Sequence, residues 1–145
     1  MKKTVIIDII CFLFIVLFVY AAVFKLIDVQ KFRVQIGQSP FLTNIAPFVA
    51  WFIPITEILV ALLLAIPRFR LTGLYASFSL MVMFTAYIIV ILNFSKHIPC
   101  SCGGVLETLG WTEHLIFNVG FILLAVVGVF LCTHQQTNYK ETATA

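Results

Sequence analysis

Apolar residues run along most of this chain in four long stretches. They cover residues 5–24, 48–66, 71–94 and 114–132, and the acidic and histidine side chains inside them are Asp8, Glu57 and His114. About 20 helical residues are enough to cross a hydrocarbon core of roughly 30 Å. Backbone in lipid must satisfy its own hydrogen bonds, and a helix does so within one segment. The pattern therefore predicts four transmembrane helices.

The polar connections between these stretches set the expected topology. Residues 67–70 form so short a link that the second and third helices must be antiparallel neighbours. The first link is longer, and residues 28–45 mix apolar and polar side chains, which favours a short interfacial helix that ends at Gly37. Residues 133–145 form a polar C-terminal tail. We expect an all-α membrane protein with a single four-transmembrane-helix bundle.

Composition supports this fold class and excludes others. Of the 145 residues, 62% are apolar and 10% are charged, whereas ordinary soluble domains have about 45–50% and about 25%. A soluble domain of this size could not bury so many apolar residues away from water. The net charge of +3 comes without a basic run, so nothing indicates nucleic-acid binding. The expected surroundings are the lipid bilayer.

Lysine and arginine positions indicate the orientation, because they are enriched in cytoplasmic loops. Lys25 can extend its amine from a helix end to the interface, so we leave it out of the comparison of basic residues on the two sides. One side then has more basic residues than the other: Lys2, Lys3, Arg68, Arg70 and Lys140 against Lys31, Arg33 and Lys96. We expect both termini in the cytoplasm and the loops 25–47 and 95–113 outside.

The first stretch also has the features of a signal peptide. Two lysines precede an apolar run, and Val19-Tyr20-Ala21 resembles the small-residue pattern of a cleavage site. Asp8 and the length of the run to Phe24 fit a membrane span better. We expect an uncleaved helix, with Asp8 at the interface near its own neighbours Lys2 and Lys3.

The most chemically specific feature is a Cys-x-Cys pair, Cys100 and Cys102, between Pro99 and the glycines Gly103 and Gly104. In a continuous helix, residues two apart diverge. Proline and glycine disfavour that helix and allow a tight turn that brings two sulfurs together. A disulfide closed over one residue is strained, and strained, exposed disulfides are usually the labile or catalytic ones. We expect thiol redox chemistry at this pair.

Two alternatives to redox chemistry remain open for Cys100 and Cys102. Both could bind zinc with His97 and His114, although the spacing is not that of a zinc knuckle, and no metal is our prediction. The two thiols could also have no chemical role. A purely structural staple is unfavourable, because so small a ring removes little unfolded-state entropy.

The other two cysteines lie in the membrane stretches, far from this loop. Cys11 and Cys132 belong to the inner halves of the first and fourth stretches, and at 1.5 Å rise per residue each is roughly 20 Å or more from it. They cannot pair with Cys100 or Cys102. We expect small packing residues, although a bond between Cys11 and Cys132 is geometrically open.

Glu57 is the central polar residue of the second stretch. An ionised carboxylate at this depth normally faces the bundle interior and has a partner. Lys25 is the nearest candidate cation, although contact requires a tilted or deeper first helix. The alternative is a neutral carboxyl that is hydrogen-bonded to a neighbouring polar residue: Thr56, Thr85, Tyr87 or Asn118.

His114 begins the fourth stretch directly after the loop that contains the cysteines. There it could take a proton from Cys100 or Cys102 and help to form the reactive thiolate. The alternative is an interfacial anchor without a catalytic role. Asn118 lies one turn further along the same helix face.

These residues in this order resemble the MauE branch of the DoxX-like membrane proteins. The resemblance extends from Val5 to Leu131 and rests on four short motifs: Lys25-Leu26-x-Asp28, Pro54-x-x-Glu57, Cys100-Ser101-Cys102-Gly103-Gly104 and Asn118. It departs from the family at Ser101 and Gly103, where Gly and Phe are usual, and at Phe117, where Arg is common.

The resemblance implies a bacterial inner-membrane protein that takes part in periplasmic thiol redox work. Cys100 and Cys102 would exchange electrons with a thioredoxin-like or disulfide-containing partner at the periplasmic face. The competing hypothesis is a non-enzymatic subunit that docks or stabilises a partner complex, and a third is a small-molecule carrier that uses Glu57. Whether the chain is an enzyme stays open.

No residue pattern in the sequence demands a cofactor. If electrons enter or leave through a quinone, the aromatic residues near Phe84 and Tyr87 could line its site. The expected catalytic residues are thus Cys100, Cys102 and His114. The expected intramembrane polar site consists of Glu57, Lys25 and Asn118.

Overall fold

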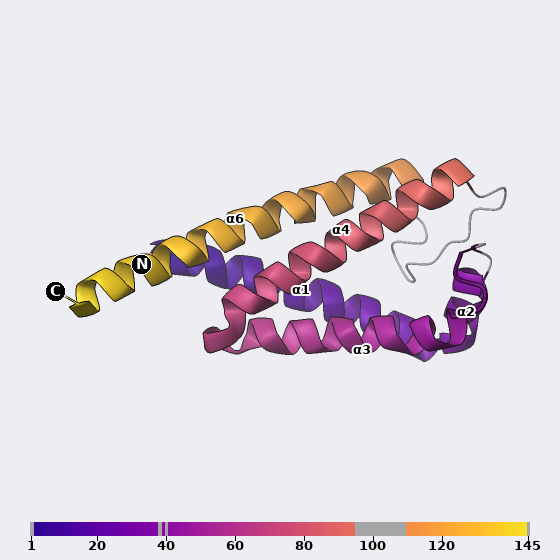
Figure 1. Cartoon of the computed structure of the whole chain (residues 1–145), viewed down its shortest axis with the longest axis horizontal. Helices are drawn as coiled ribbons and strands as arrows, with labels where there is room; N and C mark the ends of the chain where they lie inside the picture. Colours follow the sequence, from indigo (N-terminus) through magenta and orange to yellow (C-terminus); the bar gives the residue numbers. More distant parts are fainter. Residues whose placement is uncertain (1, 38, 40, 95–109, 145) are drawn as a thin grey trace.

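The computed structural model describes residues 2–37, 39, 41–94 and 110–144, and within these ranges it contains helices and no strand. Figure 1 shows the helices in chain order: α1 (Lys2–Ile27), α2 (Val29–Gly37), α3 (Ala46–Ala65), the 3-10 turn η1 (Pro67–Phe69), α4 (Arg70–Phe94) and α6 (Trp111–Thr144).

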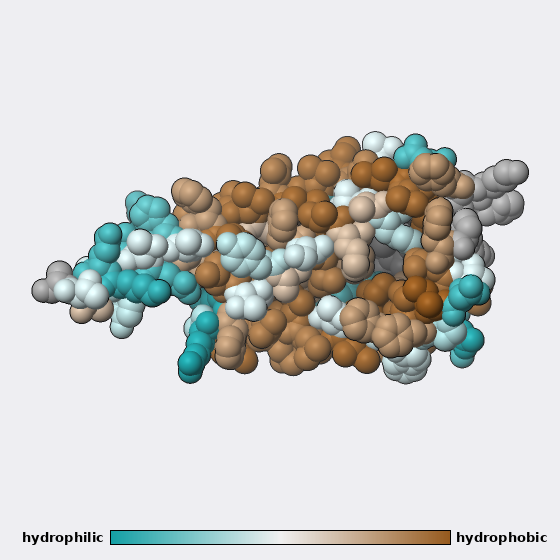
Figure 2. Space-filling model, viewed as in Figure 1, coloured by the Kyte–Doolittle hydropathy of each residue, from teal (hydrophilic) through white to brown (hydrophobic). Residues whose placement is uncertain are grey.

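Four of these helices are long and apolar enough to cross a membrane, namely α1, α3, α4 with its preceding turn, and α6. Figure 2 shows a broad hydrophobic band with hydrophilic side chains gathered toward its ends. The chain is therefore a multi-pass membrane protein, which confirms the predicted four-helix class. Both termini lie at the same end of the bundle (Figure 1), while their cytoplasmic location stays a prediction. The polar tail from residue 133 continues α6 as helix to Thr144.

The long helices make their most extensive contacts in two pairs, α1 with α3 and α4 with α6. The η1 turn joins α3 to α4. Phe14 and Phe18 of α1 are fully buried in the shared core together with Leu64 of α3 and Leu74 of α4. The ring of Phe14 meets that of Phe121 on α6 edge-on, with centroids 5.2 Å apart. Aromatic packing thus ties the two pairs together.

The short helix α2 confirms the predicted helix and its end at Gly37, while its location at the membrane interface stays a prediction. It lies across the end of the bundle, beside the start of α3 (Figure 1). Its Phe32 and Ile36 are buried in a second cluster with Ala46 and Ala50 of α3. This packing brings an aromatic side chain of α2 over the C-terminal end of α1.

Hydroxyl groups inside the membrane helices donate to the carbonyl one turn before them. Thr56 donates to Phe52 at 2.8 Å, and Thr85 donates to Met81 at 2.7 Å. Such bonds satisfy a donor within its own helix. The two threonines are therefore not the hydrogen-bond partners considered for Glu57.

Both described cysteines, Cys11 and Cys132, are free and buried in the main core cluster. This agrees with the prediction that they are small packing residues. Cys100 and Cys102 lie outside the described residues.

The position of Asp8 differs from the sequence prediction. Its carboxylate pairs with the Arg70 guanidinium at the start of α4, with 2.5 Å between Oδ1 and Nη1. We expected Lys2 and Lys3 as neighbours, but residues five and six apart do not share a helix face. The pair links the ends of α1 and α4 at the terminal end of the bundle.

Close helix contact at Gly73 generates a stability prediction. A Cβ atom there would lie 2.9–3.1 Å from side-chain and backbone atoms of Leu64, whereas a Cβ at Gly120 would meet nothing within 4 Å. Gly73→Ala should force α3 and α4 apart, at a cost of about 1–3 kcal/mol for overpacking. Thermal denaturation in detergent should show a lower Tm.

The matched control is Gly120→Ala, which gains helix propensity without a clash. It should leave the Tm unchanged or raise it. Equal Tm changes in both variants would show that α3 and α4 do not approach closely at Gly73.

Candidate functional site: a buried polar site in the bundle

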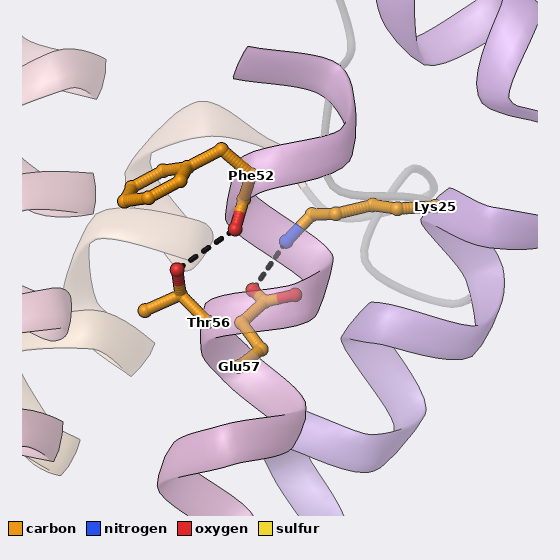
Figure 3. A network of polar contacts seen from close by, with 4 residues as sticks. All are labelled: Lys25, Phe52, Thr56 and Glu57. Atoms are coloured by element: carbon orange, nitrogen blue, oxygen red, sulfur yellow. Dashed lines mark hydrogen bonds and ion pairs between the residues drawn. The ribbon is translucent and has the colours of Figure 1, made fainter. Parts of the chain in front are cut away.

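The centre of the site is an ion pair between α1 and α3. The Lys25 amine donates to Oε1 of Glu57, as Figure 3 shows. The Lys25 side chain is 7% exposed and that of Glu57 is 0% exposed. The contact forms because Lys25 lies within α1, which continues to Ile27, and is buried there rather than extended to the interface. Of the two states considered for Glu57, the structure has the paired one.

Two aromatic rings flank the Lys25 amine. Its Nζ lies 5.0 Å from the ring centroid of Phe84 on α4 and 5.6 Å from that of Phe32 on α2. A cation at such distances is attracted to the ring faces, and more strongly where water is excluded. Four helices therefore hold this one charge in place.

Pro54 lies on the same buried side of α3, one turn before Glu57. The helix continues through it from Ala46 to Ala65, although proline cannot donate a backbone hydrogen bond. Both side chains are fully buried. Thr56, one position before Glu57, points to the other side of the helix and bonds Phe52 (Figure 3).

Two buried polar atoms near the pair have no hydrogen-bond partner within the described part of the chain. They are Oε2 of Glu57 and Nδ2 of Asn118 on α6. Asn118 is 4% exposed. Unsatisfied buried groups cost about 1–3 kcal/mol each, so native structures contain few of them. Their presence together points to a site that accepts a ligand.

Both atoms belong to residues that line one cavity of about 460 Å³. Its polar lining residues include Lys25, Glu57, His114 and Asn118, and most of the remaining lining is aliphatic or aromatic. Figure 2 shows a hollow in the half of the molecule nearer α2. The volume is typical of small-molecule sites, which are mostly apolar with a few placed polar groups.

The structure brings together four of the six predicted site residues. Lys25, Glu57, Asn118 and His114 share the cavity, and His114 is buried at the beginning of α6. Cys100 and Cys102 lie outside the described residues, but the chain on either side of them is described. α4 ends at Phe94 and α6 begins at Trp111, both at the end of the bundle near α2 (Figure 1).

The described residues do not form the zinc site that was considered as an alternative. Among residues 2–37, 39, 41–94 and 110–144, no three metal-ligating side chains cluster. His97, Cys100 and Cys102, which the alternative requires, fall outside these ranges.

Phe84 and Tyr87, which the sequence indicated as aromatic residues of a possible quinone site, both line the cavity. Sequence reasoning missed that Phe84 and Phe32 flank the Lys25 amine, and it missed the partner of Asp8. Phe32 and Phe84 are two of fifteen phenylalanines, and no local pattern separates them from lipid-facing ones. The pairing of Asp8 with Arg70 had a usable signal, because antiparallel helices bring the start of the first and the start of the third stretch to one end.

The match to known families agrees with this architecture. The family model described as methylamine utilisation protein MauE matches residues 3–131. The chain belongs to the MauE family. No significant match is found among curated proteins, and none among solved structures. The MauE match includes every residue of the polar site and extends into the fourth membrane helix, where it ends at residue 131.

The contribution of the ion pair to the free energy of unfolding of this MauE protein can be tested. Removing one partner of a buried pair leaves an uncompensated charge, which costs about 3–5 kcal/mol. Lys25→Met and Glu57→Leu should each destabilise the protein by about that much. The double variant Lys25→Met/Glu57→Leu should recover most of the loss, because no buried charge remains. Unfolding in mixed micelles would measure these free energies.

Asp8→Asn is the control, because Asp8 is 49% exposed in its pair with Arg70 and exposed pairs contribute about 0–1 kcal/mol. If the double variant lost the sum of the two single losses, Lys25 and Glu57 would not form a pair.

Proposed function

We propose that this MauE protein is a thiol–disulfide redox protein of the bacterial inner membrane. Cys100 and Cys102 exchange electrons with a thioredoxin-like or disulfide-containing partner on the periplasmic side. The buried Lys25–Glu57 site supports this proposal. Lys25 lies in the last turn of α1, and α4 ends and α6 begins at the end of the bundle near α2 (Figure 1). These two helices come before and after the Cys-x-Cys segment in the chain.

The exchange needs no cofactor for its thiol steps. One thiolate of a reduced dithiol attacks a sulfur of a disulfide and expels the other sulfur as thiolate, which forms a mixed disulfide. A second thiolate then attacks the mixed disulfide. The net result is that one dithiol becomes a disulfide and one disulfide becomes a dithiol, with two electrons and two protons exchanged.

His114 is the proposed base for the thiol. The reactive form of cysteine is the thiolate, so a nearby proton acceptor raises the rate of exchange. His114 is the first histidine after the Cys-x-Cys segment and is buried in the lining of the cavity. It would thereby connect the loop chemistry with the polar site.

Alkylation trapping in intact cells tests the redox role of Cys100 and Cys102. The pair should exist partly as a disulfide, and depletion of periplasmic oxidants should shift it toward the dithiol. Cys100→Ser or Cys102→Ser should remove the oxidised form and abolish exchange with the partner. In one of the two single variants, the mixed disulfide should accumulate, because the thiol that resolves it is missing.

Cys11→Ser is the matched control, since Cys11 is a buried packing residue, and it should keep the redox shift. Permanently free thiols, together with full function of the double variant Cys100→Ser/Cys102→Ser, would overturn the proposal. That result would favour the non-enzymatic subunit that only docks a partner.

A further inference from the structure

The cavity beside the ion pair has the features of a built ligand site. Two side chains that are more than nine-tenths buried, Glu57 and Asn118, each leave one polar atom unsatisfied within the described part of the chain. Both line the same cavity. A ligand that bonds these atoms would remove two desolvation penalties at once.

The charges at the site favour a neutral ligand. Among the described residues that line the cavity, the lysine or arginine is Lys25, and Glu57 already neutralises it. A phosphate or carboxylate would therefore meet no net positive charge and would leave an extra charge in a low-dielectric site, which is costly. Lipid headgroups that carry a phosphate are disfavoured for the same reason.

The walls favour a flat, lipid-soluble molecule. Six of the lining residues are phenylalanines: Phe18, Phe32, Phe48, Phe52, Phe84 and Phe117. Phenylalanine rings stack with planar groups in offset or edge-on arrangements. The cavity lies between α2 and helices that are long and apolar enough to cross a membrane, which favours a ligand from the lipid phase.

The hydrogen-bonding groups specify the ligand further. Asn118 Nδ2 and Lys25 Nζ are donors, and Glu57 Oε2 is an acceptor. A ring whose oxygens accept as carbonyls and donate as hydroxyls can use both kinds of group. We propose that the cavity binds the head ring of an isoprenoid quinone, with Asn118 donating to a carbonyl oxygen and Glu57 accepting from the hydroxyl of the quinol.

A bound quinone can oxidise the thiols, and this oxidation rests on the proposed function of Cys100 and Cys102. Their two thiols are oxidised to a disulfide, and the quinone takes up the two electrons and two protons to become a quinol. The disulfide then oxidises the dithiol of the partner. Binding of the ring depends only on the described cavity, so the two ideas can fail separately.

Direct binding is the test. The full-length protein in nanodiscs of zwitterionic phospholipid is titrated with ubiquinone-1, which has one isoprene unit, and empty nanodiscs correct for partitioning. Binding should be saturable. Asn118→Leu should weaken it at least tenfold without loss of folding, because leucine replaces an unsatisfied donor with an apolar group. Glu57→Gln should weaken binding of the quinol more than that of the quinone.

Thr56→Val is the matched control, since Thr56 lies next to Glu57 but bonds Phe52 and does not line the cavity. It should bind like the unchanged protein. Non-saturable uptake, or equal affinity in Asn118→Leu and Thr56→Val, would overturn the quinone site. The Cys100→Ser/Cys102→Ser variant should still bind quinone. If quinone binds but never oxidises the thiols, the transfer of electrons from the thiols to quinone is wrong and the quinone site stands, while alkylation trapping decides separately on the thiol exchange.

Discussion

The buried ion pair between Lys25 and Glu57 is the interaction on which the rest of the structure depends. Two opposite charges inside a membrane bundle are tolerated only when they meet, so their contact fixes how α1 lies against α3. The rings of Phe32 and Phe84 enclose the same amine and bring α2 and α4 to the pair. The apolar surfaces of these helices alone would allow many packing arrangements. The polar centre thus selects one of them.

The bundle has different chemistry at its two ends. At the terminal end, Asp8 and Arg70 form a partly exposed pair that joins α1 and α4. At the other end, the polar site is fully buried and opens into a cavity, and α2 covers the end of α1. The helices that flank the Cys-x-Cys segment end there. The described residues of the candidate site therefore gather at one end of the bundle, and the partly exposed ion pair lies at the other.

The sequence was sufficient to predict the four membrane helices, because runs of about 20 apolar residues have few other uses. It also predicted the interfacial helix, since Gly37 ends a short amphipathic segment. The pairing of Lys25 with Glu57 was one of two open states, because it depends on how deep Lys25 lies. The cavity, the ring of Phe84 over Lys25 and the unsatisfied amide of Asn118 arise from side chains that meet across helices, and no local pattern encodes them.

In the proposed function, the buried polar site serves the redox chemistry of Cys100 and Cys102. The most direct measurement is the rate at which the reduced pair is reoxidised in native membranes, compared between Asn118→Leu and Thr56→Val. Reoxidation should slow at least tenfold in Asn118→Leu and should be unchanged in Thr56→Val. Equal reoxidation rates in both variants would contradict it, because the polar site would then have no part in the chemistry of the cysteines.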